Sequence, residues 1–229
     1  MKLKYLNNMN SWQKAKIIKI AQASSDIKSI TVKPENSAEY TAGQHYEICI
    51  PGESIIRKYS IVSDIYEKNY LEFGVQLIES GALSPRLWDL QAGDELEIRG
   101  PLGESFIWDS SNPAPLVLLG AGSGITPLVS IYYSYHKKYP DGQCVFIMSA
   151  KDSSRIMNYD SLKDILVTRF TTTEGRIDFD FLKKHTNELT SDKDTLFFIC
   201  GPDNFIDDMV DTVLELGVAE KNIKSERFI

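Results

Sequence analysis

Hydrophobic and polar residues alternate over short stretches of the first hundred positions. The alternation predicts six strands, with Gly, Pro, Asn or Asp in most of the gaps between them. The expected strands are 14–20, 27–32, 46–50, 58–62, 70–77 and 95–98. Short strands separated by turn residues predict a small antiparallel β-barrel with Greek-key connections. One helix is expected within the series, at 84–90, with Ser84 as its N-cap and Pro85 at its first helical position.

The pattern changes after the polar segment 110–115, which contains two prolines. From there, apolar strands alternate with amphipathic helices. The expected strands are 116–119, 144–149, 165–170, 196–200 and 223–226, and the expected helices are 127–136, 179–185 and 204–216. Buried strands that alternate with helices predict a doubly wound parallel sheet covered on both faces. The sequence therefore predicts two domains, a barrel at 1–110 and an α/β domain at 115–229.

The composition is that of a folded globular protein. With 42% hydrophobic and 25% charged residues, the 229-residue chain is neither disordered nor collagen-like. The net charge of −7 argues against nucleic acid as a partner, because domains that bind nucleic acid usually have a basic face. No apolar run approaches the roughly 20 residues of a membrane helix, and no secretory signal is visible. We therefore expect no membrane span.

The cysteines Cys49, Cys144 and Cys200 are few and far apart. They form no Cys-x-x-Cys motif, and they cannot complete an iron–sulfur cluster that requires four thiolates. The histidines are equally dispersed, so no metal site is expected. Reduced thiols are typical of a cytoplasmic protein, which is the location that we expect.

The strongest local motif is a glycine-rich segment between an expected strand and an expected helix. It reads Gly120-Ala121-Gly122-Ser123-Gly124-Ile125-Thr126-Pro127. Glycine allows a sharp turn and a close approach to a ligand, and a helix N-terminus offers free N–H groups to a pyrophosphate. The spacing departs from the usual dinucleotide fingerprint, because Ile125 stands where that fingerprint has its third glycine. The alternative is a glycine-rich turn that binds nothing.

Two weaker motifs lie in the barrel half. In an extended strand, Arg57 and Tyr59 face one side while Lys58 and Ser60 face the other. An Arg guanidinium suits a phosphate, and a Tyr ring suits stacking on a flat ring. The second motif, Gly81-Ala82-Leu83-Ser84, opens the expected helix, where N–H groups and a hydroxyl also suit a phosphate. Taken alone, each motif is more typical of an ordinary barrel strand or helix start.

Taken together, the motifs resemble the ferredoxin–NADP⁺ reductase superfamily. The resemblance rests on Arg57-x-Tyr59-Ser60-x-x-Ser63, Gly81-x-x-Ser84, Gly120-x-Gly122-x-Gly124-x-x-Pro127 and Cys200-Gly201-Pro202, which occur in this order. It extends from about Trp12 to Phe228, nearly the whole chain. It implies a flavin bound by the barrel and a nicotinamide dinucleotide bound by the α/β domain.

The resemblance also implies roles for the residues of the barrel motifs. Arg57, Gly81 and Ser84 are expected to bind the flavin phosphate. Tyr59 is expected to lie against the isoalloxazine ring, and Ser60 to hydrogen-bond near flavin N5. The implied flavin is FAD, with FMN as the alternative because these residues would contact only the part that the two flavins share.

In the second half, the resemblance implies a nucleotide site and the remaining catalytic residues. The residues expected at NAD(P) are Gly120, Gly122, Gly124, Thr126, Arg169, Arg176, Cys200, Gly201 and Pro202. Cys200 is expected near nicotinamide C4, and Glu226 and Phe228 beside the flavin. Ser60, Cys200 and Glu226 are therefore the expected catalytic residues. The alternatives are packing for Cys200 and a solvated carboxylate for Glu226.

The choice between NADPH and NADH depends on cations near the adenosine ribose. Arg169 and Arg176 resemble positions where NADPH-using relatives keep basic residues, and Lys151 and Arg155 follow the preceding strand. An Arg fork matches the extra phosphate of NADPH. These four residues favour NADPH, with four solvated surface cations as the alternative.

The sequence as a whole predicts a flavoprotein oxidoreductase that takes hydride from NAD(P)H onto bound FAD. The chain ends at Ile229, directly after the terminal motif, with no ferredoxin-like extension. A separate acceptor such as ferredoxin, flavodoxin or a small molecule is therefore expected. Two alternatives remain: a nucleotide-binding electron-transfer or regulatory subunit of a larger complex, and a flavin reductase that uses free flavin as its substrate.

Overall fold

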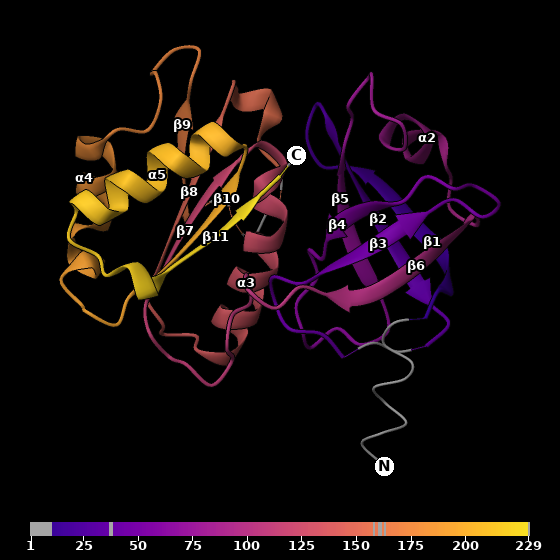
Figure 1. Ribbon diagram of the computed structural model, residues 1–229, viewed down its shortest axis with the longest axis horizontal. Coiled ribbons are helices and arrows are strands. Elements are labelled where there is room, and N and C mark those ends of the chain that lie inside the picture. Colours follow the sequence, from indigo (N-terminus) through magenta and orange to yellow (C-terminus); the bar gives the residue numbers. More distant parts are fainter. Residues whose placement is uncertain (1–10, 37–38, 158, 160–161, 163, 229) are drawn as a thin grey trace.

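The computed structural model describes residues 11–36, 39–157, 159, 162 and 164–228. It contains two β-sheets, with helix α3 (Ile125–Lys138) between them (Figure 1). One sheet has six antiparallel strands in the order β4-β3-β6-β1-β2-β5, and the other has five parallel strands in the order β11-β10-β7-β8-β9. The expected fold class, an antiparallel barrel followed by a doubly wound α/β unit, is confirmed.

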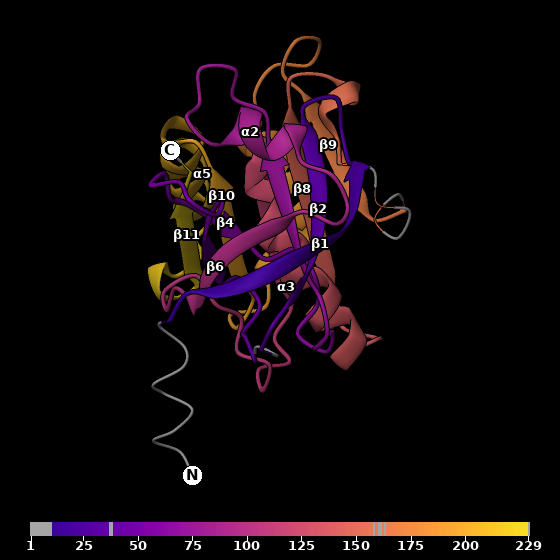
Figure 2. The ribbon, with the colours of Figure 1, turned by 90° about the vertical axis from the view of Figure 1, so that its right-hand side faces the viewer.

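The antiparallel sheet closes on itself. Its strands are β1 (Gln13–Gln22), β2 (Ile27–Pro34), β3 (His45–Cys49), β4 (Arg57–Ser60), β5 (Leu71–Gln76) and β6 (Glu95–Leu102). The edge strands β4 and β5 meet through a bridge between Ile61 and Phe73. Figure 2 shows β1 and β6 crossing the barrel in front of α3. The core inside is apolar because alternate strand residues, such as Ile17, Tyr46 and Phe73, point inward and are buried.

The short helix α2 (Ser84–Asp89) corrects one expectation. Ser84 is the first helical residue rather than the N-cap. The N-cap is Leu83, whose side chain makes no capping hydrogen bond. The Ser84 hydroxyl instead accepts a hydrogen bond from the Ile78 N–H at 3.1 Å. The preceding turn therefore competes successfully with the helix end for this hydroxyl.

The parallel sheet is covered on both faces. Its elements in chain order are β7 (Leu116–Ala121), η1 (Gly122–Gly124), α3, β8 (Cys144–Ala150), η2 (Ser153–Arg155), β9 (Leu166–Phe170), α4 (Phe179–Thr190), β10 (Leu196–Gly201), α5 (Asp203–Glu215), η4 (Glu220–Asn222) and β11 (Ile223–Arg227). Leu118 and Phe198 pack with α3 and the barrel, whereas Val117 and Ile199 pack under α4 and α5. This division explains why the strands are apolar throughout.

Two helices are longer than the sequence pattern predicts. Helix α3 begins at Ile125, two residues before Pro127, because proline is tolerated in the first helical turn. Helix α4 continues to Thr190, and Asp178 caps its start by accepting a hydrogen bond from the Phe181 N–H.

Within the described residues, no helix combines the length and the apolar character that a membrane crossing requires.

Candidate active site

Three of the expected site residues lie in one row across the parallel sheet. Strands β7 and β10 are neighbours, and the chain leaves them in opposite directions, toward β8 and toward β11. Gly120 pairs with Cys200, and Cys200 pairs with Glu226, near the carboxyl ends of their strands. Doubly wound sheets bind their ligands at this kind of switch point. The row therefore marks the ligand-binding edge of the sheet.

The glycine-rich turn depends on two of its glycines. Gly122 has a φ of +55°, a conformation that other residues rarely adopt. A Cβ atom on Gly124 would lie 2.3 Å from the Cys200 carbonyl oxygen, so only glycine lets the turn approach β10. Helix α3 begins directly after this turn. Its free N–H groups therefore sit at the switch point, where they suit a pyrophosphate.

Thr126 has a different part in this turn. Its hydroxyl donates to the Ser123 carbonyl at 2.8 Å, and a Cβ on Gly74 of β5 would lie 2.4 Å from its methyl carbon. The side chain is 1% exposed. Thr126 therefore packs the turn against the barrel, and any contact with a nucleotide would have to come from its backbone.

Cys200 and Glu226 form the chemically distinctive pair of the row. Cys200 is fully buried, and burial together with the nearby charge of Glu226 raises the pKa of its thiol well above the ordinary value. Burial also raises the pKa of Glu226 to about 7, against the lowering effect of the Lys58 charge. The Glu226 Oε2 atom is buried and accepts no hydrogen bond from any described residue. The pair thus offers a neutral thiol beside a carboxyl group that can hold a proton near neutral pH.

The barrel contributes strand β4 to this region. Tyr59 pairs with the buried Tyr46, and Ser60 pairs with His45, so the two side chains face opposite sides of the sheet. The Ser60 residue is 4% exposed, and its hydroxyl has no partner among the described residues. Lys58 lies on the same side as Ser60, and its charge acts on Glu226. Strand β4 is therefore the part of the barrel that faces the row.

Arg57 is available to an anion. The residue is exposed, and among the described residues its guanidinium donates only to the Ile56 carbonyl, at 2.8 Å. In the described part of the chain no carboxylate lies within ion-pair distance of it. A free guanidinium on β4, the free Ser60 hydroxyl and the unpartnered Glu226 oxygen suit a flavin that has a phosphate, a polar ring and an N–H edge. The residues present therefore fit the flavin that the sequence predicts.

Gly81 and Ser84 are engaged in a local turn. The Gly81 N–H donates to the Ile78 carbonyl at 2.7 Å, and Ser84 bonds the same residue through its hydroxyl. A Cβ on Gly81 would lie 2.9 Å from both the Ile78 carbonyl and the Ser84 hydroxyl. The two residues thus shape the loop before α2, and no interaction of the described residues joins them to the row.

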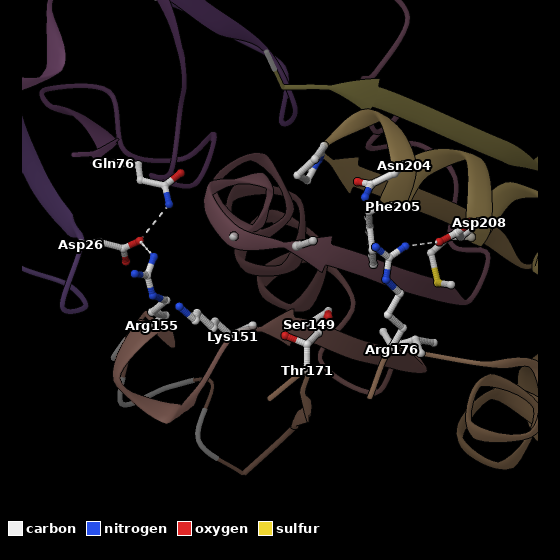
Figure 3. A pocket seen from close by; sticks show the side chains of 16 residues that line it. Asp26, Gln76, Ser149, Lys151, Arg155, Thr171, Arg176, Asn204, Phe205 and Asp208 are labelled. Atoms are coloured by element: carbon white, nitrogen blue, oxygen red, sulfur yellow. Dashed lines mark hydrogen bonds and ion pairs between the residues drawn. The ribbon is translucent and has the colours of Figure 1, made fainter. Parts of the chain in front are cut away.

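A cavity of about 310 Å³ opens beside the glycine-rich turn (Figure 3). Of the expected nucleotide residues, Gly122, Arg176 and Pro202 line it. The sequence prediction missed the further lining residues Asp26, Gln76, Ser149, Thr171, Asn204, Phe205, Asp208 and Met209. The spacing of Asn204 and Asp208, one helical turn apart after Cys200-Gly201-Pro202, was a usable signal. No signal marks Asp26 and Gln76, because they come from the barrel.

The expected rim cations separate into two groups. Arg155, Arg176 and Lys151 line the cavity. Arg169 does not, because its guanidinium lies 4.9 Å from the Phe181 ring and 3.6 Å from the Asp178 carboxylate. Helix α4 therefore holds Arg169 away from the cavity.

The C-terminal strand fixes the last of the expected residues. The Phe228 N–H donates to the Gly201 carbonyl at 2.9 Å, and its half-buried ring packs against the core that includes Cys200. Gly201 is close-packed, since a Cβ there would lie 2.9 Å from the Phe205 ring. Gly201, Pro202 and Phe228 therefore lie together at the end of β10.

Comparisons with known proteins agree with this architecture. Residues 14–107 match the model of an oxidoreductase FAD-binding domain, and residues 118–211 match that of an oxidoreductase NAD-binding domain. The first match covers the barrel, and the second covers most of the parallel sheet with its helices.

Among curated proteins, the chain is 35% identical to a flavohemoprotein of Bacillus subtilis over an alignment of 247 positions, gaps included. The alignment covers 95% of this chain and 60% of that protein. It is 29% identical over 176 residues to NADH-cytochrome b5 reductase 2 of Candida glabrata, covering 69% of this chain and 58% of the relative. The chain thus spans about three fifths of the length of these relatives.

Among solved structures, the fold resembles cytochrome P450 reductase GcoB of Amycolatopsis. The TM-score is 0.82 at 21% sequence identity, over 95% of this chain and 70% of that chain.

Proposed function

We propose that this chain, which belongs to the ferredoxin–NADP⁺ reductase superfamily, takes hydride from NAD(P)H onto bound FAD and passes the electrons to a separate acceptor. The observation that carries the proposal is the row of Gly120, Cys200 and Glu226 at the switch point, with the barrel strand β4 facing it. A nucleotide on the glycine-rich turn and a flavin on β4 would meet at this row.

The residues of the row suit this chemistry. Bound FAD supplies the hydride acceptor and can release its electrons one or two at a time. Cys200, a small and neutral side chain, leaves room for the nicotinamide ring and excludes water from the end of β10. Glu226 holds a proton near neutral pH, and the Ser60 hydroxyl is free to orient the flavin. In this proposal Phe228 borders the flavin, and Arg57 binds its phosphate.

Four further site residues keep the roles that the sequence predicts, as proposals. Gly81 and Ser84 form the loop that would follow the flavin phosphate. Gly120 lets the turn pack closely on α3, and Gly122 leaves the backbone open to the pyrophosphate. We place the division between the two domains in the segment 110–115.

The electron acceptor differs among the relatives. The relatives are named for a haem protein, cytochrome b5 and cytochrome P450, so related modules serve different acceptors. We propose a separate redox protein for this chain, with ferredoxin and flavodoxin tested beside cytochrome b5 and a cytochrome P450.

The function is tested on the purified protein. We expect it to be yellow, to release FAD on heating, and to reduce ferricyanide rapidly with NADH or NADPH. Release of FMN alone would contradict the FAD assignment. A colourless protein that reduces added flavin would instead be a flavin reductase, and a yellow protein that oxidises neither nucleotide would be a binding subunit.

Arg57→Ala is expected to weaken flavin binding about tenfold. The loss of a charge-assisted hydrogen bond to phosphate costs about 1.5 kcal/mol at the lower end of the usual range, which applies because Arg57 is exposed. The measurement is the dissociation constant of FAD from fluorescence titration of the flavin-free protein. Arg99→Ala is the control, since it removes the same charge from a barrel guanidinium that Glu47 already binds. Equal FAD affinity in both variants would remove Arg57 from the site.

A further inference from the structure

One acidic residue of the barrel reaches into the cavity of the α/β domain. Asp26 lies in the turn between β1 and β2, and the Ser25 N–H at this turn donates to the Ser154 carbonyl of η2 at 2.8 Å. The turn is therefore fastened to the segment that follows β8. Figure 3 shows the Asp26 carboxylate directed at Arg155 on one side of the cavity.

The Asp26 carboxylate is held by three donors. Arg155 Nη1 and Gln76 Nε2 donate to its Oδ2 at 2.7 Å and 2.8 Å, and the Ser24 hydroxyl donates to its Oδ1 at 3.0 Å. The Asp26 side chain is only 15% exposed, so water screens the pair with Arg155 less than it screens surface pairs. These hydrogen bonds hold the Asp26 carboxylate in place, and Arg155 therefore stays paired with it.

The second ion pair at the cavity is much looser. Arg176 Nη1 lies 2.9 Å from Asp208 Oδ2, with side chains 67% and 53% exposed. Exposed pairs of this kind contribute about 0.2–1 kcal/mol. Arg176 can therefore exchange its partner for another anion at little cost, whereas Arg155 cannot.

We propose that Asp26 is a specificity-determining residue for the nucleotide, which biases the chain toward NADH. The inference rests on the proposed function. The 2′-phosphate of NADPH needs a free cation at the cavity rim, and Arg is the residue best suited to it. Asp26 occupies the guanidinium of Arg155 and adds its own negative charge, so a second anion there is disfavoured. The inference runs against the NADPH preference expected from the four cations in the sequence.

The test compares a ligand with and without the 2′-phosphate. Adenosine 2′,5′-bisphosphate and AMP are titrated calorimetrically into the FAD-loaded protein, wild type and Asp26→Asn. Asparagine keeps the size of the side chain and removes the charge. We expect the affinity for the bisphosphate relative to AMP to rise about tenfold in Asp26→Asn. The ratio of kcat/KM for NADPH and NADH is expected to move in the same direction.

Asp178→Asn is the matched control. Asp178 also pairs with an arginine, Arg169, but neither residue lines the cavity. Asparagine preserves the cap that Asp178 provides to α4. The relative affinity is expected to stay at the wild-type value in this control, although the net charge changes equally. An equal rise in both variants would make the effect one of net charge and overturn the role of Asp26.

Arg155→Ala tests the same ion pair from its other side and is used also if Asp26→Asn does not fold. Removal of Arg155 leaves the Asp26 charge unpaired beside the cavity, so the relative affinity for the bisphosphate is expected to fall below the wild-type value. In the double variant Asp26→Asn/Arg155→Ala, the gain of the single Asp26 variant is expected to disappear. A wild type that prefers the bisphosphate tenfold, or a rise of the relative affinity in Arg155→Ala, would overturn the inference.

Failure of the proposed function is a separate result. It would appear as a wild type that oxidises neither NADH nor NADPH. The binding ratio of the two adenosine ligands would still decide the role of Asp26 in that case.

Discussion

Replacing Gly124 with alanine is expected to destabilise the protein by about 3 kcal/mol and to remove its affinity for nucleotide. The added Cβ would lie 2.3 Å from the Cys200 carbonyl oxygen and 2.8 Å from the Gly201 nitrogen. Both neighbours belong to the backbone of β10, which pairs on both sides and cannot shift alone. Overpacking of this kind costs about 1–3 kcal/mol, and the upper end applies where only backbone can move. The turn and β10 would separate at the switch point itself.

The measurement is urea unfolding together with a nucleotide titration. We expect a lower midpoint with an unchanged slope, since the surface exposed on unfolding stays the same. Ser123→Ala serves as the control in the same turn, because it keeps the backbone carbonyl that Thr126 bonds. Wild-type stability and nucleotide affinity in Gly124→Ala would show that the turn does not depend on its approach to β10.

The elements of this fold are readable in the sequence because their patterns are unambiguous. Strand 196–200 is wholly apolar and lies inside the parallel sheet, between β11 and β7, where both faces are covered. The glycine-rich segment at 120–127 was predictable for a similar reason, because its glycines lie between an apolar strand and a helix and indicate a strand-to-helix turn. In both cases the neighbouring residues were enough to predict the element.

The partners of three side chains could not be predicted. Asp26 reads as an ordinary turn residue after two serines, and only the docking of the barrel brings it to Arg155. Arg169 reads as a rim cation, but the aromatic ring of Phe181 on α4 attracts its guanidinium to the other side. Ser84 reads as an N-cap until the Ile78 turn takes its hydroxyl. Each case depends on a partner that sequence spacing does not identify.

Glu226 predicts an unusual dependence of stability on pH. Burial raises the pKa of its carboxyl from the ordinary value of 4.5 to about 7 in the folded protein. Between these values the folded chain keeps the proton and the unfolded chain has released it, so stability falls as pH rises. The contribution is complete below about pH 4.5 and is lost as pH passes about 7. It amounts to at most about 3 kcal/mol.

Glu226→Gln is expected to remove this dependence, because the amide stays neutral at every pH. The free energy of unfolding, measured with urea from pH 5 to pH 8, should fall in the wild type and change less in the variant, which gains relative stability toward pH 8. Glu220→Gln, an exposed carboxylate in η4, controls for the loss of one negative charge. We also expect an inflection near pH 7 in NAD(P)H-dependent ferricyanide reduction by the wild type, which vanishes in Glu226→Gln and persists in Glu220→Gln. Parallel pH profiles in the wild type and Glu226→Gln would contradict a raised pKa of the Glu226 carboxyl in the folded protein.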